Sequence, residues 1–538
     1  MAAGEMRYWG WGEDSRAPAP NRHLIEWLDG RLGALGPHTA PAPPSGFDER
    51  PSRLKGKDIA RLEEVVGSQG VSLAFQDRLV HAAGKGYPDL VRMRAGGRVA
   101  LPDAVVYPGD PGSAAALLAL CAQRSIAVVP FGGGTSVVGG VDPERGGMRA
   151  VVTLDTGRLR SVLQVDTVSR IARLEAGLRG PEVEYALAPY GLTLGHFPQS
   201  FEYSTVGGWV ATRSAGQASS GYGRIDDLVR GVRLVAPSGA LELDARPASA
   251  AGPDLRELVV GSEGTFGLIT DVEVELARRP GETRYEAFLF PGFAAGSQAL
   301  RELAQEGLAP EVTRLSDEDE TGFYLAAAGL EGTRRRLLGR YLAARGGELE
   351  SAAMAVMGWE GEPGTGQRRR ARALEVMKRH GAATIGAGAG RTWARGRFEG
   401  PYLRDELMGR GVMVETLETA TTWANSAHLY DAVRDALLRE APVVGCHISH
   451  VYPTGCCLYF TFLARQEESD PIGQWERVKR RACRAIVKAG GTITHHHGIG
   501  ADHRRYLKHE DGRLGVSVLK GARNRLDPDG VMNPGKLL

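Results

Sequence analysis

The fold is decided by the stretch Val128-Val129-Pro130-Phe131-Gly132-Gly133-Gly134-Thr135-Ser136-Val137-Val138-Gly139-Gly140-Val141. Its apolar start is typical of a strand, which ends in three glycines followed by two hydroxyl residues. Backbone without Cβ atoms can turn sharply there and direct several N–H groups at one point. The stretch therefore indicates a seat for a pyrophosphate, with a glycine-rich hairpin as the alternative. It matches neither the Gly-x-Gly-x-x-Gly loop of a dinucleotide-binding βαβ unit nor a Walker loop.

Two later stretches repeat the same mixture of small and hydroxyl residues. Residues 198–209 read Pro-Gln-Ser-Phe-Glu-Tyr-Ser-Thr-Val-Gly-Gly-Trp, and residues 261–267 read Gly-Ser-Glu-Gly-Thr-Phe-Gly. Three such segments in order indicate one extended ligand. With them the chain resembles the flavoproteins of the vanillyl-alcohol oxidase (PCMH) type. That resemblance implies an α+β fold, with FAD held in a two-subdomain binding domain and an α+β substrate (cap) domain beside it.

Length, charge and cysteine usage exclude several classes of protein. At 538 residues the chain exceeds the size at which a single core stops growing, so two or three domains are expected. Lys plus Arg (66) nearly balances Asp plus Glu (64), which argues against a nucleic-acid partner. Five cysteines without paired spacing indicate a reducing compartment and no structural disulfide.

Targeting patterns are not found in the sequence. No apolar run reaches the length of a membrane span, and the first residues lack the charged and hydrophobic blocks of a signal peptide. The last residues, Gly535-Lys536-Leu537-Leu538, differ from the Ser-Lys-Leu peroxisomal address. We expect a cytoplasmic protein that is soluble or peripheral to a membrane.

Four regions follow from the order of patterns along the chain. Residues 1–96 are expected to be an irregular, partly proline-rich segment with a helix at 53–69. Residues 97–280, which alternate short β runs with a helix at 111–123, form the expected FAD-binding domain. Residues 281–490 form the expected cap domain, whose arginine-rich helices at 334–345 and 368–379 favour a solvated face over a membrane-surface face. Residues 491–538 are expected to return to the flavin domain.

The run His495-His496-His497-Gly498-Ile499-Gly500 is the second distinctive stretch. Side chains on an extended segment alternate faces, so three adjacent histidines do not easily converge on one metal; two would need help from elsewhere. We expect no metal. An imidazole beside a buried ligand can bind an anion or move a proton near neutral pH. A purely structural histidine cluster is the alternative.

The whole chain, from Trp9-Gly10-Trp11-Gly12 to its end, resembles the alkyldihydroxyacetone phosphate synthases (alkylglycerone-phosphate synthases) in particular. The segments that carry this resemblance are residues 198–209, 314–315, 402–405, 415–419, 452–460 and the histidine triplet. These flavoenzymes are transferases that make the ether bond of ether lipids: a fatty alcohol replaces the acyl group of acyl-dihydroxyacetone phosphate through a covalent adduct at flavin N5, with no net oxidation. The resemblance also implies a homodimer and peripheral membrane contact. One alternative is an FAD-linked oxidase or dehydrogenase of a 2-hydroxy acid or alcohol, and another is a flavin-binding protein without catalysis.

The resemblance assigns roles to individual residues. It implies that Tyr459 is an acid/base group, working with His495, His496 and His497, although a strand tyrosine often only packs. Arg404 matches a phosphate-binding arginine, for which a guanidinium fork is suited, although a surface ion pair with Asp405 is the alternative. Arg314 and His196 are the further expected substrate-binding residues.

For FAD, the matching residues are Pro130, Phe131, Gly132, Gly133, Gly134, Thr135, Ser136, Gln199, Ser200, Phe201, Glu202, Tyr203, Ser204, Thr205, Thr212, Arg213, Ser214, Ala215, Gly261, Ser262, Glu263, Gly264, Thr265, Phe266 and Gly267. The chain departs from the family in two places. Gln199 replaces an acidic residue, and Tyr452-Pro453-Thr454-Gly455 replaces Tyr-Asp-Ala-Gly, which removes a carboxylate near the site. The first glycine loop holds no histidine or cysteine, so a non-covalent flavin is expected.

Overall fold

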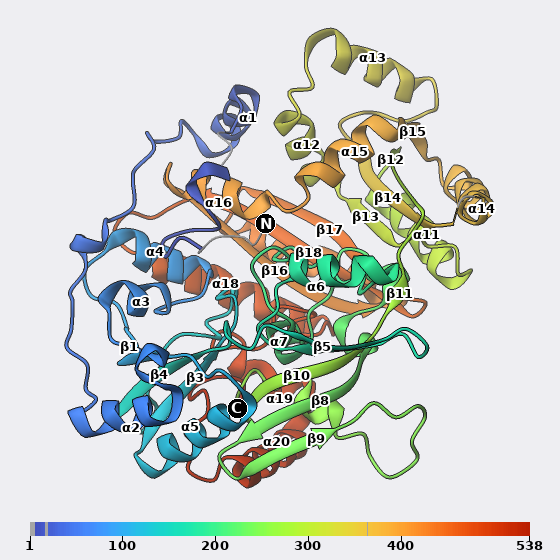
Figure 1. Cartoon of the computed structure of the whole chain (residues 1–538). Coiled ribbons are helices and arrows are strands. Elements are labelled where there is room, and N and C mark those ends of the chain that lie inside the picture. The colour runs from blue at the N-terminus through green and yellow to red at the C-terminus, as the bar shows by residue number, and fades with distance from the viewer. Residues whose placement is uncertain (1–5, 17–19, 363) are drawn as a thin grey trace.

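The computed structural model describes residues 6–16, 20–362 and 364–538, so parts of the expected irregular first segment (1–5 and 17–19) lie outside the described residues. Two sheets come from the first half of the chain and one larger sheet from the second half (Figure 1). Helices and sheets are mixed throughout, which confirms the predicted α+β class.

The first sheet has the strand order β1-β2-β4-β3, and β2, β4 and β3 run parallel. Helix α5 (Pro111–Gln123) connects β2 to β3 and matches the predicted helix; Asp110 caps it by accepting a hydrogen bond from the Ser113 N–H. Because β3 ends at Phe131, the glycine loop leaves from the carboxyl edge of the sheet. The strands are β1 (Val71–Ser72), β2 (Ala104–Val106), β3 (Ile126–Phe131) and β4 (Ala150–Asp155).

The second sheet is antiparallel, with the order β5-β6-β10-β8-β9. Helix α7 (Val206–Thr212) packs on β6 and β10. Thr205 caps this helix, since its Oγ1 accepts from the Gly208 N–H. The strands are β5 (Val162–Asp166), β6 (Ile171–Glu175), β8 (Val229–Ala236), β9 (Gly239–Leu243) and β10 (Leu268–Glu275), and a small ribbon pairs β7 (Leu192–Thr193) with β11 (Ala277–Arg278).

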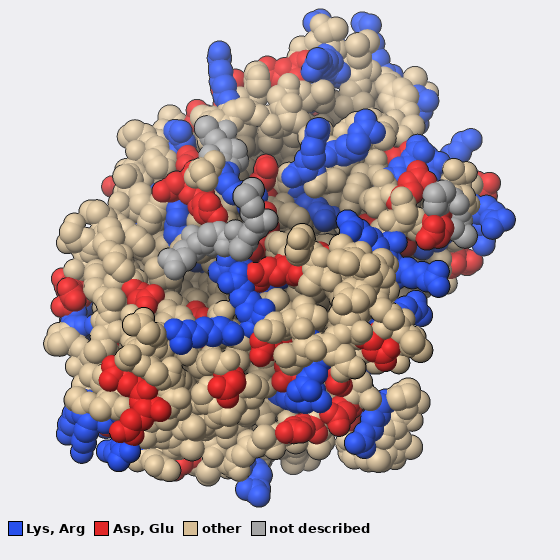
Figure 2. Space-filling view, in the orientation of Figure 1, with Lys and Arg blue, Asp and Glu red and all other residues tan. Residues whose placement is uncertain are grey.

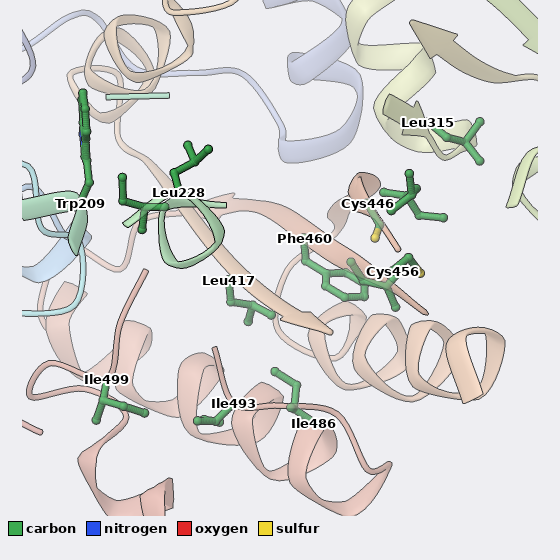
Figure 3. Packing of buried hydrophobic residues seen from close by; sticks show 14 of the residues in the cluster. Trp209, Leu228, Leu315, Leu417, Cys446, Cys456, Phe460, Ile486, Ile493 and Ile499 are labelled. Carbon is green, nitrogen blue, oxygen red and sulfur yellow. The ribbon is translucent and has the colours of Figure 1, made fainter. Parts of the chain in front are cut away.

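The third sheet, the cap sheet, is antiparallel with the order β15-β12-β14-β13-β17-β18-β16. Its core lies between one face of the sheet and the helices α11, α14 and α17, with α18 behind them; Figure 3 shows Leu417, Phe460 and Ile486 in this core. The opposite face turns toward the first two sheets and carries α12, α15 and α16. The strands are β12 (Glu282–Phe290), β13 (Val312–Ser316), β14 (Ala353–Gly361), β15 (Ala383–Ile385), β16 (Val412–Thr422), β17 (Val443–Val451) and β18 (Gly455–Arg465).

The remaining helices surround these sheets. In the first half they are α1 (Arg22–Leu32), α2 (Gly56–Val66), α3 (Phe75–Val80), α4 (Tyr87–Ala95), α6 (Gly180–Leu187), α8 (Ser219–Tyr222), α9 (Ile225–Leu228) and α10 (Arg256–Val259). In the second half they are α11 (Phe293–Gln305), α12 (Glu318–Ala327), α13 (Gly332–Ala343), α14 (Thr365–Arg379), α15 (Gly386–Gly396), α16 (Gly400–Met408), α17 (Ser426–Leu438), α18 (Pro471–Lys488), α19 (Leu507–Glu510) and α20 (Gly512–Leu526).

The last residues return to the first sheet. The Val128 N–H donates to the Val531 carbonyl at 2.8 Å, and the Asn533 N–H donates to the Val128 carbonyl at 2.8 Å. The tail thus extends the sheet along β3, the strand that feeds the glycine loop. The chain's last segment therefore lies against the first sheet, and the division into four regions stays a prediction.

Surface charges are mixed rather than segregated. Figure 2 shows basic and acidic side chains interspersed over one face. Several arginines of α14 pair with carboxylates, among them Arg369 with Glu311 and Arg370 with Glu286. All five cysteines are free and buried, in line with the prediction of no disulfide. Among the described residues, no helix has both the length and the apolar character needed to cross a membrane.

Candidate active site

A single cavity of about 470 Å³ runs between the first two sheets and the cap sheet. Its wall has three parts: a glycine cradle formed by residues 130–136, a polar centre on the cap sheet around Tyr459, and an apolar arm. The arm is lined by Phe323, Leu403, Leu407, Val414, Val443 and Leu463. The three parts come from segments that are far apart in the sequence.

The glycine cradle is too tight for side chains at its turn. A Cβ on Gly133 would overlap the Tyr203 carbonyl oxygen, and one on Gly132 would overlap the Thr205 hydroxyl. Ser136 Oγ accepts from the Gly140 N–H at 3.0 Å, which curls the loop back on itself. Close backbone, small residues and hydroxyl groups around an elongated cavity suit a dinucleotide with its pyrophosphate, so the residues present fit FAD.

The predicted cofactor residues divide into two groups. All of residues 130–136 line the cavity, as do Gln199, Ser200, Ser204, Thr205, Thr212, Ser214, Ala215, Glu263, Gly264 and Gly267. The others do not line it and support it from behind: Phe201, Glu202, Tyr203, Arg213, Gly261, Ser262, Thr265 and Phe266. Glu263, which does line the cavity, also accepts the Ile499 and Gly500 N–H groups at 2.6 and 2.7 Å, and this joins its segment to the end of the histidine run.

Tyr459 lies at the middle of β18, paired in register with His447 on β17 and Glu418 on β16. The Tyr459 ring stacks on the His447 ring. The centroid of the Tyr459 ring lies 5.9 Å from the centroid of the His496 ring and 5.5 Å from the centroid of the His497 ring. Burial raises the pKa of the Tyr459 phenol. Tyr459 is therefore protonated at neutral pH and is able to donate a proton.

Glu418 fixes the shape of the histidine triplet. Its carboxylate accepts the backbone N–H groups of His495, His496 and His497 at 2.6, 3.2 and 2.7 Å. Burial opposes ionisation, yet the His497 and His496 rings and these N–H groups lower the pKa of Glu418 to about 2. Because three successive N–H groups converge on one carboxylate, the segment is curled, and the extended chain assumed from the sequence is wrong here.

Because of the curl, the three histidine side chains point in different directions. His496 and His497 line the cavity, whereas His495 turns toward a second pocket, where its Nε2 lies 2.8 Å from the Tyr452 hydroxyl. The donor atoms of His495, His496 and His450 lie within 4.8 Å of one another, so side chains from elsewhere do approach two of the triplet. His495 and His496 are hydrogen bonded to each other through Nδ1 at 2.9 Å, and the expectation of no metal stays a prediction.

His196 lies behind the cavity rather than in its wall. It is buried, with Nε2 at 3.2 Å from the Ser214 hydroxyl and its ring against Trp209. Burial lowers the pKa of His196 to about 3, so this imidazole is neutral. Of the predicted substrate-binding residues, the cavity brings together Arg314 and Arg404 but not His196.

Arg404 is held in place by a carboxylate and by the first described residues of the chain. Its guanidinium donates to Asp405 Oδ1 at 3.0 Å and to the Lys85 carbonyl at 2.7 Å. Asp405 Oδ2 in turn accepts the Trp11 N–H at 2.5 Å. Residues 6–12, the amino-terminal clasp, thus pack on α16. The ion pair with Asp405 exists, but it is buried and orients an arginine that lines the cavity.

Arg314 belongs to a second buried network. Its Nη2 donates to Glu320 Oε1 at 3.2 Å and to the Tyr324 hydroxyl at 3.0 Å. Burial opposes ionisation of Glu320, but His447 and Arg314 lower its pKa to about 2. This network joins β13 and α12 to the polar centre.

The apolar arm leads away from the polar centre under α12 and α16. Leu407, Val414, Val443 and Leu463 are all less than 10% exposed and belong to one cluster with three leucines of α1: Leu24, Leu28 and Leu32. The arm thus presents only hydrocarbon over the length of several residues.

Sequence reasoning missed His447, His450 and Glu320. On the strand next to that of Tyr459, His447 stands between the apolar Cys446 and Ile448, an alternation that could have placed its side chain on the face of Tyr459. Glu320 ends the acidic run Ser316-Asp317-Glu318-Asp319-Glu320, which is typical of a solvated helix start, and no local signal marks it as buried.

Comparisons with known proteins identify this architecture. A family model for the FAD binding domain matches residues 102–243, and one for the C-terminal domain of FAD linked oxidases matches residues 279–537. A solved structure of 4-ethylphenol oxidase from Gulosibacter chungangensis covers 91% of this chain and 98% of its own, with a TM-score of 0.67 at 15% identity, which shows the shared fold. The fold and the cavity define a flavoprotein of the vanillyl-alcohol oxidase type, and FAD is its cofactor.

More similar proteins narrow the class. The alkyldihydroxyacetonephosphate synthase of Trypanosoma brucei brucei is 35% identical over 540 residues, covering 96% of this chain and 88% of the relative. A solved structure of an alkyldihydroxyacetonephosphate synthase superposes with a TM-score of 0.85 at 27% identity, covering 98% of both chains. The chain belongs to the alkyldihydroxyacetonephosphate synthase family, and it is an FAD-dependent enzyme.

Proposed function

We propose that this enzyme exchanges the acyl group of acyl-dihydroxyacetone phosphate for a long-chain fatty alcohol, forming an ether bond without net oxidation. The observation that carries the proposal is the apolar arm, which ends at Tyr459 and the two arginines. The alternative hypothesis is an oxidase of a small 2-hydroxy acid, and such a substrate has no group that would fill the arm.

The arginines suit the phosphate end of the substrate. Arg404 is oriented by Asp405, and Arg314 by Glu320, so neither side chain has to be ordered on binding. Guanidinium groups bind phosphate oxygens through paired charge-assisted hydrogen bonds. In this proposal they hold the dihydroxyacetone phosphate unit with its reacting carbon next to the polar centre.

Bound in the glycine cradle, FAD supplies a reactive ring nitrogen and a ring system that can take up charge. Tyr459, whose phenol is protonated, then acts as the proton donor next to the reacting carbon. The neighbouring His496, whose pKa is lowered to about 3 by burial and by His497, is a neutral imidazole that can accept a hydrogen bond from substrate or phenol.

The apolar arm excludes water from the alkyl chain. Burying a methylene group contributes about 0.8 kcal/mol, so an arm of this kind selects long-chain alcohols over short ones. Contact with a membrane surface and a homodimer, which the family resemblance implies, belong to the same proposal; sedimentation with and without anionic vesicles tests both.

The test supplies acyl-dihydroxyacetone phosphate and labelled hexadecanol to the purified holoenzyme. Labelled alkyl product and free fatty acid are expected in equal amounts, with the flavin spectrum unchanged at the end. Absence of alkyl product from a protein with intact FAD would overturn the proposal. Rapid anaerobic bleaching of the flavin by lactate or glycolate would favour the oxidase instead.

A further inference from the structure

The wall between the apolar arm and the polar centre is a ladder of paired residues on β17 and β18. Three cross-strand pairs line the cavity in order, Val443 with Leu463, Gly445 with Thr461 and His447 with Tyr459. Successive pairs on one face are two residues apart, so the ladder spans roughly 13 Å at about 3.3 Å per residue. An alkyl chain that lies on its apolar end brings its head group to His447 and Tyr459.

The Glu320 carboxylate holds the His447 ring in place through one of its ring nitrogens. The distance from His447 Nδ1 to Glu320 Oε1 is 2.8 Å, and Arg314 Nη2 lies 3.0 Å from the same ring nitrogen. An ionised carboxylate can only accept and a guanidinium can only donate, so one of the two partners sets the tautomer. Arg314 Nη2 carries two N–H groups, and Glu320 Oε1 and the Tyr324 hydroxyl accept them, so none is left for His447 Nδ1. The Nδ1–H of His447 therefore donates to Glu320. Nε2 is left as the basic nitrogen of the imidazole.

A glycine makes this anchoring possible. Gly445 lies on the same face of β17 as His447, and a Cβ at Gly445 would come 2.9 Å from Glu320 Cβ. Any larger residue would push α12 away from the strand and Glu320 away from the imidazole. The sequence thus places a glycine where the carboxylate has to approach.

The proposed reaction needs two proton transfers. One occurs at the substrate carbon, where Tyr459 acts. The other occurs at the alcohol, whose O–H bond breaks as its oxygen bonds to that carbon. Because the Tyr459 phenol is protonated, it cannot accept a second proton, so the alcohol proton needs another acceptor.

We propose that His447 Nε2 is the base that takes the hydroxyl proton of the fatty alcohol, and that Glu320 positions His447 and stabilises the imidazolium. This inference rests on the proposed function. In a first half-reaction, which needs no alcohol, the bond from carbon to the acyl oxygen breaks and its electron pair leaves with the fatty acid carboxylate; FAD, when bound, would supply the electron pair that holds the carbon until the alcohol arrives. In the second half-reaction an oxygen lone pair of the alcohol forms the new C–O bond at that carbon, the electron pair returns to the FAD, and the hydroxyl proton passes to His447 Nε2. The proton on His447 then passes to the carboxylate or to water.

Neutral His447 is available for this step. Burial, with the Arg314 charge beside it, lowers the pKa of His447. An ionised carboxylate on the far side of an imidazole holds its tautomer and favours the protonated ring once it forms. Glu320 is a positioning residue in this scheme, because it acts through His447.

The experiment compares H447Q with H428Q, a control at an exposed histidine on α17. The holoenzymes are assayed for flavin absorbance, for fatty acid released from acyl-dihydroxyacetone phosphate without alcohol, and for alkyl product from hexadecanol and from the more acidic 2,2-difluorohexadecanol. For H447Q we expect intact flavin, acid release within about twofold of wild type, and alkyl product reduced about 100-fold or more. With the difluoro alcohol, the loss of alkyl product in H447Q relative to wild type should be about tenfold smaller than with hexadecanol, since a more acidic hydroxyl depends less on a base.

Three outcomes would overturn the role of His447: product from H447Q within about threefold of wild type, an equal loss of acid release and product, or no preference for the acidic alcohol. If H447Q loses its flavin, E320Q decides, because it leaves the imidazole in place. Since Glu320 also holds Arg314, E320Q is assayed at saturating acyl-dihydroxyacetone phosphate, where alkyl product should fall about tenfold or more further than acid release. Failure of the wild-type enzyme to form alkyl product would instead refute the proposed function, so the two failures are distinguishable.

Discussion

The rings of His447 and Tyr459 stack with their centroids 4.8 Å apart and their planes 19° from parallel, because the two residues are direct partners across β17 and β18. Two side chains that can exchange protons thus stand side by side on a rigid sheet. Sites built on strands hold their groups more exactly in place than sites on loops. The geometry gives the polar centre two distinct proton carriers.

Replacing Tyr459 by phenylalanine removes only the hydroxyl. We expect product formation by Y459F to fall by about 10²- to 10⁴-fold, as for loss of an acid/base group, while the yellow flavin stays bound. Turnover and the flavin absorbance spectrum measure the two effects. Loss of flavin together with activity would mean that the hydroxyl is structural.

Asp405→Asn tests the orientation of Arg404. The buried carboxylate binds Arg404 and the Trp11 N–H, and hydrogen bonds to charged groups contribute about 1.5–3 kcal/mol. We expect the KM for the phosphate substrate to rise about tenfold or more and kcat to change by less than about threefold. The control is E406Q, whose carboxylate lies next to His38 instead. Equal effects in both variants would contradict the prediction.

Gly133→Ala tests the glycine cradle. The added methyl would overlap the backbone carbonyl of Tyr203, which cannot move aside as a flexible side chain can. We expect G133A to be purified with less than about a tenth of the wild-type FAD content, since even 1.4 kcal/mol changes an equilibrium tenfold. In G147A, where nothing lies within 4 Å of the new methyl, FAD content should be unchanged. Full FAD occupancy in G133A would show that the loop does not contact the cofactor.

Glu418→Gln tests what shapes the histidine triplet. A carboxyl whose pKa falls from an ordinary 4.5 to about 2 on folding stabilises the protein above pH 4.5, and that contribution is lost as pH falls toward 2. At pH 7 the shift corresponds to about 3 kcal/mol, of which about 0.8 kcal/mol is lost by pH 4. The difference between wild type and E418Q in the free energy of unfolding by urea should therefore narrow between pH 7 and pH 4.

A control variant, E476Q, removes an exposed carboxylate that pairs with Arg480. Exposed ion pairs contribute about 0–1 kcal/mol, so its stability should stay near that of wild type at both pH values. A difference between wild type and E418Q that does not change with pH would show that the charge of Glu418 is not what holds the loop.

The glycine cradle and the helix before it could be predicted because their signals are local. Pro111–Gln123 carries its own cap in Asp110, and three adjacent glycines allow few other conformations. The same reasoning failed at the triplet. Glu418 of β16 imposes the curl of His495–His497 through their backbone N–H groups. No pattern within the triplet itself predicts this curl.

The burial of charged residues is the second feature that could not be predicted from the sequence. Glu320 and Asp405 have charged neighbours in the sequence. They are buried because α12 and α16 pack on the cap sheet. Their partners come from β13, β17 and the amino-terminal clasp. Such long-range contacts depend on how the sheets meet, which local propensity does not encode.

The amino-terminal clasp and the tail strand have a practical consequence for work with this enzyme. Residues 6–12 reach Asp405, which binds Arg404, and residues 531–533 pair with the strand that precedes the glycine cradle. An affinity tag at either terminus adds its bulk next to a segment that shapes the site. Residues 246–254, which follow β9, are exposed and belong to neither segment, so we expect an epitope inserted there to leave both segments in place.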